Sequence, residues 1–246
     1  MDTKTNSAIR LNSIILQAYQ NENKLIKDVW KDVFQIDLKY GYLLEKSIIS
    51  CLDSLNDEFE FFKKDMEETN FSKELYINEI SNLQKSLIVP TGINGDWEQR
   101  KKQITNVHFK IFDFCSEILP TNEEQIDSND IKELKKLISE LEDFIEKNSL
   151  PKDLKRILEQ HISKIKVALY TYNINGINVF DEVLQSAYGE VIKNKNIFSD
   201  DSNNKVKEKI AKVWSHTQKI YNIGKGTEQL YIDFNNITNS LQDLLS

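Results

Sequence analysis

The stretch that decides the fold is LLEKSIISCLDSLNDEFEFF, which spans residues 43–62. Its apolar side chains recur every three or four residues, at Leu44, Ile48, Cys51, Leu55, Phe59 and Phe62. This period places them on one face of an α-helix, whereas a strand would need a period of two. The same spacing returns at Leu230, Phe234, Ile237, Leu241 and Leu244. The sequence therefore predicts an all-α fold.

About nine segments share this spacing, and only 7 Gly and 3 Pro interrupt the 246 residues. The pattern predicts a multi-helix bundle with helices over about 7–34, 43–68, 70–88, 96–118, 130–147 and 151–172, around 180–191 and 206–220, and after Gly226. Phe34 to Tyr42 alternates like a strand, but the chain offers this stretch no partner strand. We expect it to be a folded-in connector that ends at Gly41.

A polar, acidic stretch from Leu119 to Asn129 separates two sets of predicted helices. It predicts an N-terminal helical bundle over 1–119 and a C-terminal bundle over 130–246. One continuous domain is the open alternative. Residues 1–150 hold 19 Lys/Arg and 28 Asp/Glu, whereas residues 151–246 hold 13 and 11. The N-terminal half is therefore the acidic one.

The bulk composition argues against several classes of protein. With 12 Phe, 9 Tyr and 3 Trp, the chain can bury a sizeable core. A net charge of −7 argues against wrapping nucleic acid by charge alone. No apolar run suits a signal peptide or a bilayer span. Cys51 and Cys115 lie in apolar stripes, Cys115 between Ile111 and Ile118, which favours buried free thiols in a reducing compartment. We therefore expect a cytoplasmic protein that does not insert into membranes.

No catalytic, cofactor or metal site is predicted. His108, His161 and His216 lie on or beside apolar helical stripes, without the close pairs of His or Cys that zinc needs. Gly224-Lys225-Gly226-Thr227 lacks the first glycine of a phosphate-binding loop, so we interpret it as a hinge. The acidic loop 200–204 lacks the glycine and the final glutamate of an EF-hand. The acidic end of the 43–68 helix is expected to be a solvated face, formed by Glu58, Glu60, Asp65, Glu67 and Glu68.

Surplus aromatic residues are the main hint of a binding role. Consecutive helical residues point about 100° apart, so Phe59, Phe61 and Phe62 cannot all face one core. Such aromatics favour a protein partner or self-association, because large rigid rings dominate interface energetics. The candidate partner-binding residues are Phe61, Phe62, Tyr170 and Tyr221.

A lysine-rich segment over 193–219 supports a second interpretation. Lys205, Lys209 and Lys212 share one helical face and are candidates for binding nucleic acid. No arginine lies among them, although arginine is the usual reader of base edges. A solvated lysine face is the simpler interpretation.

The preferred hypothesis is a non-enzymatic helical interaction subunit or adaptor of a bacterial complex. Asn occurs 24 times and Ala 5 times, a bias typical of AT-rich genes, which favours a mobile-element or phage-defence setting. The alternatives are a nucleic-acid-associated accessory subunit and an enzyme whose site residues are dispersed over several helices.

Overall fold

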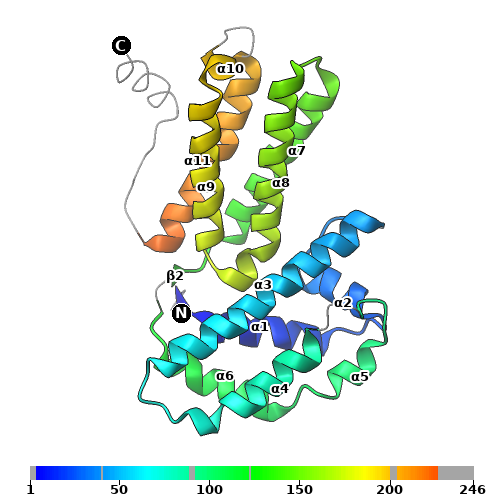
Figure 1. Cartoon of the computed structure of the whole chain (residues 1–246), viewed down its shortest axis with the longest axis vertical. Helices are drawn as coiled ribbons and strands as arrows, with labels where there is room; N and C mark the ends of the chain where they lie inside the picture. Colours follow the sequence, from blue (N-terminus) through cyan, green and yellow to red (C-terminus); the bar gives the residue numbers. More distant parts are fainter. Residues whose placement is uncertain (1–3, 40, 89–91, 122, 200–203, 227–246) are drawn as a thin grey trace. The chain divides into compact units, whose positions relative to one another are not determined.

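The computed structural model describes residues 4–39, 41–88, 92–121, 123–199 and 204–226 (Figure 1). These residues form eleven α-helices and one short 3₁₀ helix, and their strands are limited to two-residue segments, β1 (Lys4–Thr5) and β2 (Glu123–Glu124). The predicted all-α, multi-helix fold is therefore confirmed. The helix expected from Leu230 to Leu244 lies outside the described residues.

The chain divides into two compact units. Unit 1 comprises residues 1–122 and 170–176, and unit 2 comprises 123–169 and 177–246. The predicted domains, 1–119 and 130–246, stay a prediction. The helices of unit 1 are α1 (Ser7–Gln20), α2 (Ile26–Val33), α3 (Tyr42–Glu67), η1 (Lys73–Leu75), α4 (Ile77–Leu87), α5 (Trp97–Lys101) and α6 (Asn106–Ile118). Those of unit 2 are α7 (Ser128–Lys147), α8 (Lys152–Asn175, whose last turns belong to unit 1), α9 (Asn178–Lys193), α10 (Lys195–Ser199) and α11 (Asn204–Lys225).

The expected single helix over 7–34 was wrong, because the chain breaks between α1 and α2. The Asn21 side chain accepts a hydrogen bond from the Asn23 backbone N–H at 2.9 Å, a local bond that competes with helix continuation. The backbone beyond it pairs with a distant turn, since the Lys24 carbonyl accepts from Trp97 N–H at 2.7 Å and Ile26 N–H donates to Gly95 O at 3.0 Å. These groups are therefore unavailable to a continuous helix.

The expected helix over 96–118 is also interrupted. Asp96 caps α5 by accepting a hydrogen bond from the Glu98 backbone N–H at 2.9 Å. A second start follows at Thr105, which forms a capping box with His108 at the beginning of α6. A short polar cap at this position satisfies N–H groups that have no helical partner, so it begins a new helix.

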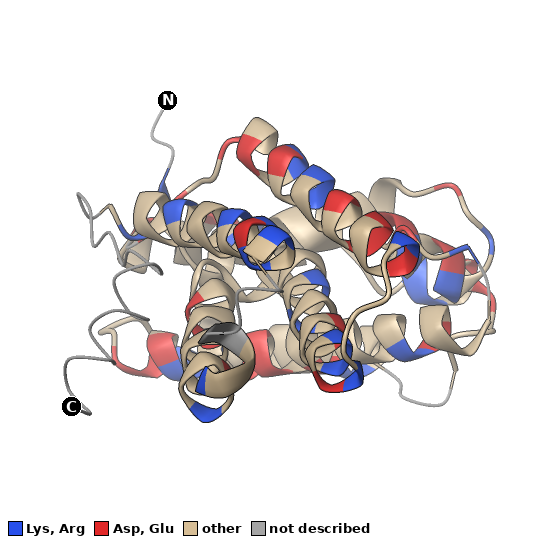
Figure 2. Cartoon of the chain, turned by 90° about the horizontal axis from the view of Figure 1, so that it is seen from above, with Lys and Arg blue, Asp and Glu red and all other residues tan. Residues whose placement is uncertain are grey.

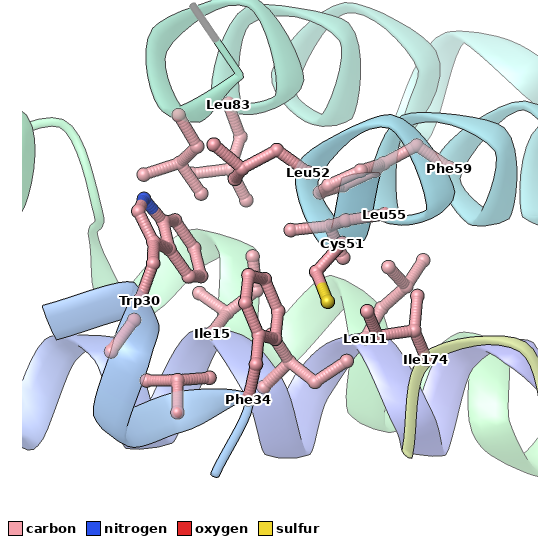
Figure 3. Packing of buried hydrophobic residues seen from close by; sticks show 14 of the residues in the cluster. Leu11, Ile15, Trp30, Phe34, Cys51, Leu52, Leu55, Phe59, Leu83 and Ile174 are labelled. Carbon is pink, nitrogen blue, oxygen red and sulfur yellow. The ribbon is translucent and has the colours of Figure 1, made fainter. Parts of the chain in front are cut away.

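The core of unit 1 lies between α1, α2, α3, α4 and α6. Figure 3 shows the indole of Trp30 from α2 and the ring of Phe34, just after α2, facing side chains of α1 and α3. Leu55 and Phe59 are fully buried, as their spacing predicted. The described residues of the alternating stretch after α2 form a connector and no strand, and Phe34 and Ile36 of this stretch are buried. Gly41 has a φ of 90° where α3 begins, a conformation that glycine adopts without strain.

Unit 2 is a helical bundle in which α7, α8, α9 and α11 run side by side (Figure 1). Helix α7 buries Leu134, Ile138, Leu141 and Ile145 along one face. Gly224 lies within α11, so the expected hinge is wrong at this residue. A Cβ there would lie 2.9 Å from the Ile177 Cβ, so the glycine allows close packing. Gly226, with a φ of 62°, follows the helix end as a C-terminal cap glycine does.

Candidate functional site

His108 is a helix cap and has no sign of being a metal ligand. Its Nδ1 accepts a hydrogen bond from the Thr105 backbone N–H at 3.0 Å, and its Nε2 lies 3.7 Å from Glu79 Oε2. Burial lowers the pKa of His108, which favours the neutral ring that can accept this bond. The spacing of Thr105 and His108 was the sequence signal for this role.

The two cysteines are buried in unit 1 and are poor nucleophiles. Burial raises the pKa of Cys51 to about 12 and that of Cys115 to about 11. The thiolate is the reactive form of cysteine, so neither thiol is activated at neutral pH. Figure 3 shows the Cys51 sulfur surrounded by apolar side chains.

The other two histidines are parts of unit 2. The His216 Nε2 lies 2.9 Å from the Asp130 carbonyl oxygen. Both ring nitrogens of His161 are buried and find no hydrogen-bond partner in the described part of the chain, and its ring meets Trp214 edge to face. Desolvation lowers the pKa of His161 to about 4. In the described part of the chain, no group of three or more His, Cys, Asp or Glu side chains could hold a metal ion.

Glu58 corrects the prediction of a solvated acidic face on α3. Its carboxylate is buried, and it accepts hydrogen bonds from Arg10 Nη2 at 2.7 Å and Arg10 Nε at 3.0 Å. Arg10 Nε also donates to the Ile174 carbonyl oxygen at 3.0 Å. This ion pair joins α1, α3 and the 170–176 segment within unit 1. No local sequence pattern indicated it, because Glu58 and Arg10 are 48 positions apart.

The lysine candidates lie on α11, where Lys205 and Lys212 are exposed. The Nζ of Lys209 lies 5.7 Å from the centroid of the Phe144 ring, so this lysine packs on α7. Lys219 Nζ donates to Asp130 Oδ1 at 2.6 Å. Figure 2 shows basic and acidic residues interspersed along the helices. Part of the lysine-rich segment is therefore engaged by neighbouring helices of unit 2.

The four aromatic candidates occupy different environments. Phe61 is 52 % exposed on α3. Phe62 is fully buried against Tyr76 and Phe112, and Tyr170 is buried in the core of unit 1. Tyr221 is half-buried, with the Lys225 Nζ 5.9 Å from its ring centroid. Only Phe61 of this set is open to a partner in this conformation.

An apolar stripe that was not predicted lies on the surface of α6. Val107 is 51 % exposed, Phe114 66 % and Ile118 38 %, while Ile111 between them is half-buried. Positions 107, 111, 114 and 118 fall within a sector of about 60° on a helical wheel. Sequence reasoning had assigned Ile111 and Ile118 to the buried stripe of this helix. The offset spacing of Val107 and Phe114 was the signal for a second apolar face.

Two other sides of α6 are occupied. His108, Phe112 and Cys115 face the core of unit 1, about 100° around the helix from the stripe. A third side packs on α1, where Asn12 Nδ2 donates to Asp113 Oδ1 at 2.8 Å and Tyr19 meets Phe109 edge to face. We call the stripe of Val107, Ile111, Phe114 and Ile118 the α6 outer face. A helix with two apolar faces is typical of an element that packs on two partners.

Comparison of the chain with models of known families, with curated proteins and with solved structures found no match. Among the helices that the structure describes, none combines the length and the apolar character needed to cross a bilayer. The candidate site therefore rests on the geometry of the α6 outer face.

Proposed function

We propose that the chain is a non-enzymatic, helical protein-interaction subunit that binds its partner through the α6 outer face. The observation that carries this proposal is the exposure of Val107, Phe114 and Ile118 on a helix whose other apolar face is already buried. Exposed apolar stripes of this kind gain stability by burial against another protein. The raised pKa values of the two thiols fit a non-enzymatic role.

A nucleic-acid-associated role is the second candidate, favoured by exposed Lys205 and Lys212 on one side of α11. Binding through these lysines would weaken steeply with salt, because each neutralised phosphate releases counterions. The engagement of Lys209 and Lys219 by α7 leaves fewer charges for such a surface. The composition led us to propose a bacterial, mobile-element or phage-defence setting. Identification of the partner would test this setting.

The test is capture of partners by the tagged full chain from its native host, with and without nuclease. A captured protein is identified, purified and mixed again with wild type, Phe114→Asp and Phe61→Asp. Phe61→Asp is the matched control, because Phe61 is also an exposed phenylalanine of unit 1.

We expect nuclease-resistant binding that is lost in Phe114→Asp and retained in Phe61→Asp. Equal binding by both variants would show that the partner docks elsewhere. Recovery of nucleic acid alone would favour the lysine surface of α11.

A further inference from the structure

We infer that the partner on the α6 outer face is a second copy of this chain, docked with its α6 antiparallel across a two-fold axis. The inference rests on the proposed function, since it names the occupant of the same surface. It comes from the charges that flank the stripe and from the side of the helix on which they lie.

The α6 outer face has the spacing of a coiled-coil seam. Val107, Ile111, Phe114 and Ile118 follow alternating steps of four, three and four residues, as d and a positions of a heptad do. In an antiparallel pair with a two-fold axis, Val107 would pack against Ile118 of the second copy. Ile111 would likewise pack against Phe114 of the second copy. One helix therefore supplies both halves of a self-complementary seam.

Opposite charges occupy one flank of this seam. Lys110 and Glu117 lie seven residues apart, both are exposed, and among the described residues neither forms an ion pair. They occupy the same heptad position, just before Ile111 and Ile118. In an antiparallel pair this flank faces the same flank of the second copy. Lys110 of each copy would then meet Glu117 of the other, which gives two complementary ion pairs.

A parallel arrangement would leave these charges unmatched. In a parallel pair the Lys110 flank of one helix would face the opposite flank of the other, which holds His108 and Cys115. Both of these side chains are buried in the core of unit 1, so neither offers Lys110 or Glu117 an opposite charge. Charge placement therefore favours the antiparallel geometry.

The expected dimer is weak. Helix α6 has 13 residues and a length of about 20 Å. A single helix pair of this length buries less than the roughly 1,200 Å² of a standard stable interface. We expect association in roughly the micromolar range or weaker.

The test is sedimentation velocity of the full chain at loading concentrations from about 1 to about 500 µM. Wild type should shift from monomer to dimer over this range. Lys110→Glu and Glu117→Lys should each weaken the dimer about tenfold, because each replaces two attractions by two repulsions. The double exchange Lys110→Glu/Glu117→Lys should restore the wild-type dimer to within about twofold. An equimolar mixture of the two single variants should form a mixed dimer.

Lys46→Glu is the control for net charge, because Lys46 is an exposed lysine of α3 outside the seam, and it should dimerise as wild type does. A monomer at every concentration would overturn the inference, as would a dimer insensitive to Lys110→Glu. Failure of the double exchange to restore the dimer would overturn the antiparallel geometry. If wild type stays monomeric but a reconstituted foreign partner still requires Phe114, the inference fails and the proposed function stands.

Discussion

Units 1 and 2 differ in what they leave on the surface. Unit 1 exposes eleven of the thirteen large apolar side chains that are exposed in the described residues, and unit 2 exposes two, Val167 and Ile192. Unit 1 nevertheless has a large core that includes Trp30, Trp97 and Phe59. Its apolar surface is therefore no sign of an incomplete core. The difference supports the proposal that unit 1 is the part of the chain that contacts another protein.

One buried polar group in each unit illustrates a second difference. In unit 1 the buried Glu58 pairs with the part-buried Arg10, whereas in unit 2 His161 is buried with no hydrogen-bond partner among the described residues. A buried charge that loses its partner costs more than a buried neutral ring. The units should therefore respond differently to substitution and to pH.

The largest expected effect is that of Glu58→Ala. It removes the buried carboxylate that accepts two hydrogen bonds from Arg10, so the free energy of unfolding should fall by about 3–5 kcal/mol. Glu60→Ala is the matched control, because Glu60 is a largely exposed residue of α3 that pairs with Lys63, and it should cost less than about 1 kcal/mol. Urea unfolding measures both. Equal losses would mean that the Arg10–Glu58 pair contributes no more than a surface pair.

The next effect concerns pH and unit 2. Because the pKa of His161 falls from 6.5 to about 4 on folding, the unfolded chain binds this proton first as the solution is acidified. The contribution of neutral His161 to the free energy of unfolding is complete above pH 6.5. It is lost progressively as the pH falls to 4, by at most about 3 kcal/mol. In His161→Leu the free energy of unfolding should therefore fall less steeply with decreasing pH than in wild type. Urea unfolding between pH 7 and 4.5 tests it, and parallel slopes for the two proteins would contradict it.

A smaller effect is expected from Gly224→Ala in unit 2. The new Cβ would lie 2.9 Å from the Ile177 Cβ, so α11 or the 177 segment must shift. Such overpacking should lower the free energy of unfolding by about 1–3 kcal/mol. Gly189→Ala is the control, because a Cβ there meets no atom within 4 Å. If Gly224→Ala were as stable as Gly189→Ala, the close approach would be easily relieved.

The smallest effect should come from Phe114→Ser on the α6 outer face. Phe114 is exposed, so its loss should change the free energy of unfolding of the dilute chain by less than about 0.5 kcal/mol. Phe112→Ser on the core side of the same helix should cost several times as much, because Phe112 is fully buried. Comparable losses for the two variants would show that Phe114 belongs to the core.

Local spacing was enough to predict the helical class and the buried stripe of α3. It failed where distant segments decide the outcome. The break after Gln20 depends on backbone pairing with residues 93–97, and the burial of Glu58 depends on Arg10. Neither partner is visible from nearby residues.

The candidate site was missed for a different reason. On α6 the buried and exposed apolar residues are interleaved, so a single stripe through Ile111, Cys115 and Ile118 fitted the spacing as well as two faces did. Among the aromatic candidates, the surplus of rings did not indicate which of Phe61 and Phe62 faces the core. That choice depends on Tyr76 and Phe112, which come from other helices.

The most direct test of the α6 outer face is ¹⁹F NMR of the full chain with fluorophenylalanine at position 114 alone, recorded as chain concentration rises. A second sample carries the label at position 61. We predict that the signal at 114 shifts, broadens and becomes protected from a soluble paramagnetic reagent, while the signal at 61 keeps its exposure. If the signal at 114 stays sharp and open to the reagent at every concentration and also with a purified partner bound, the α6 outer face is not an interaction surface.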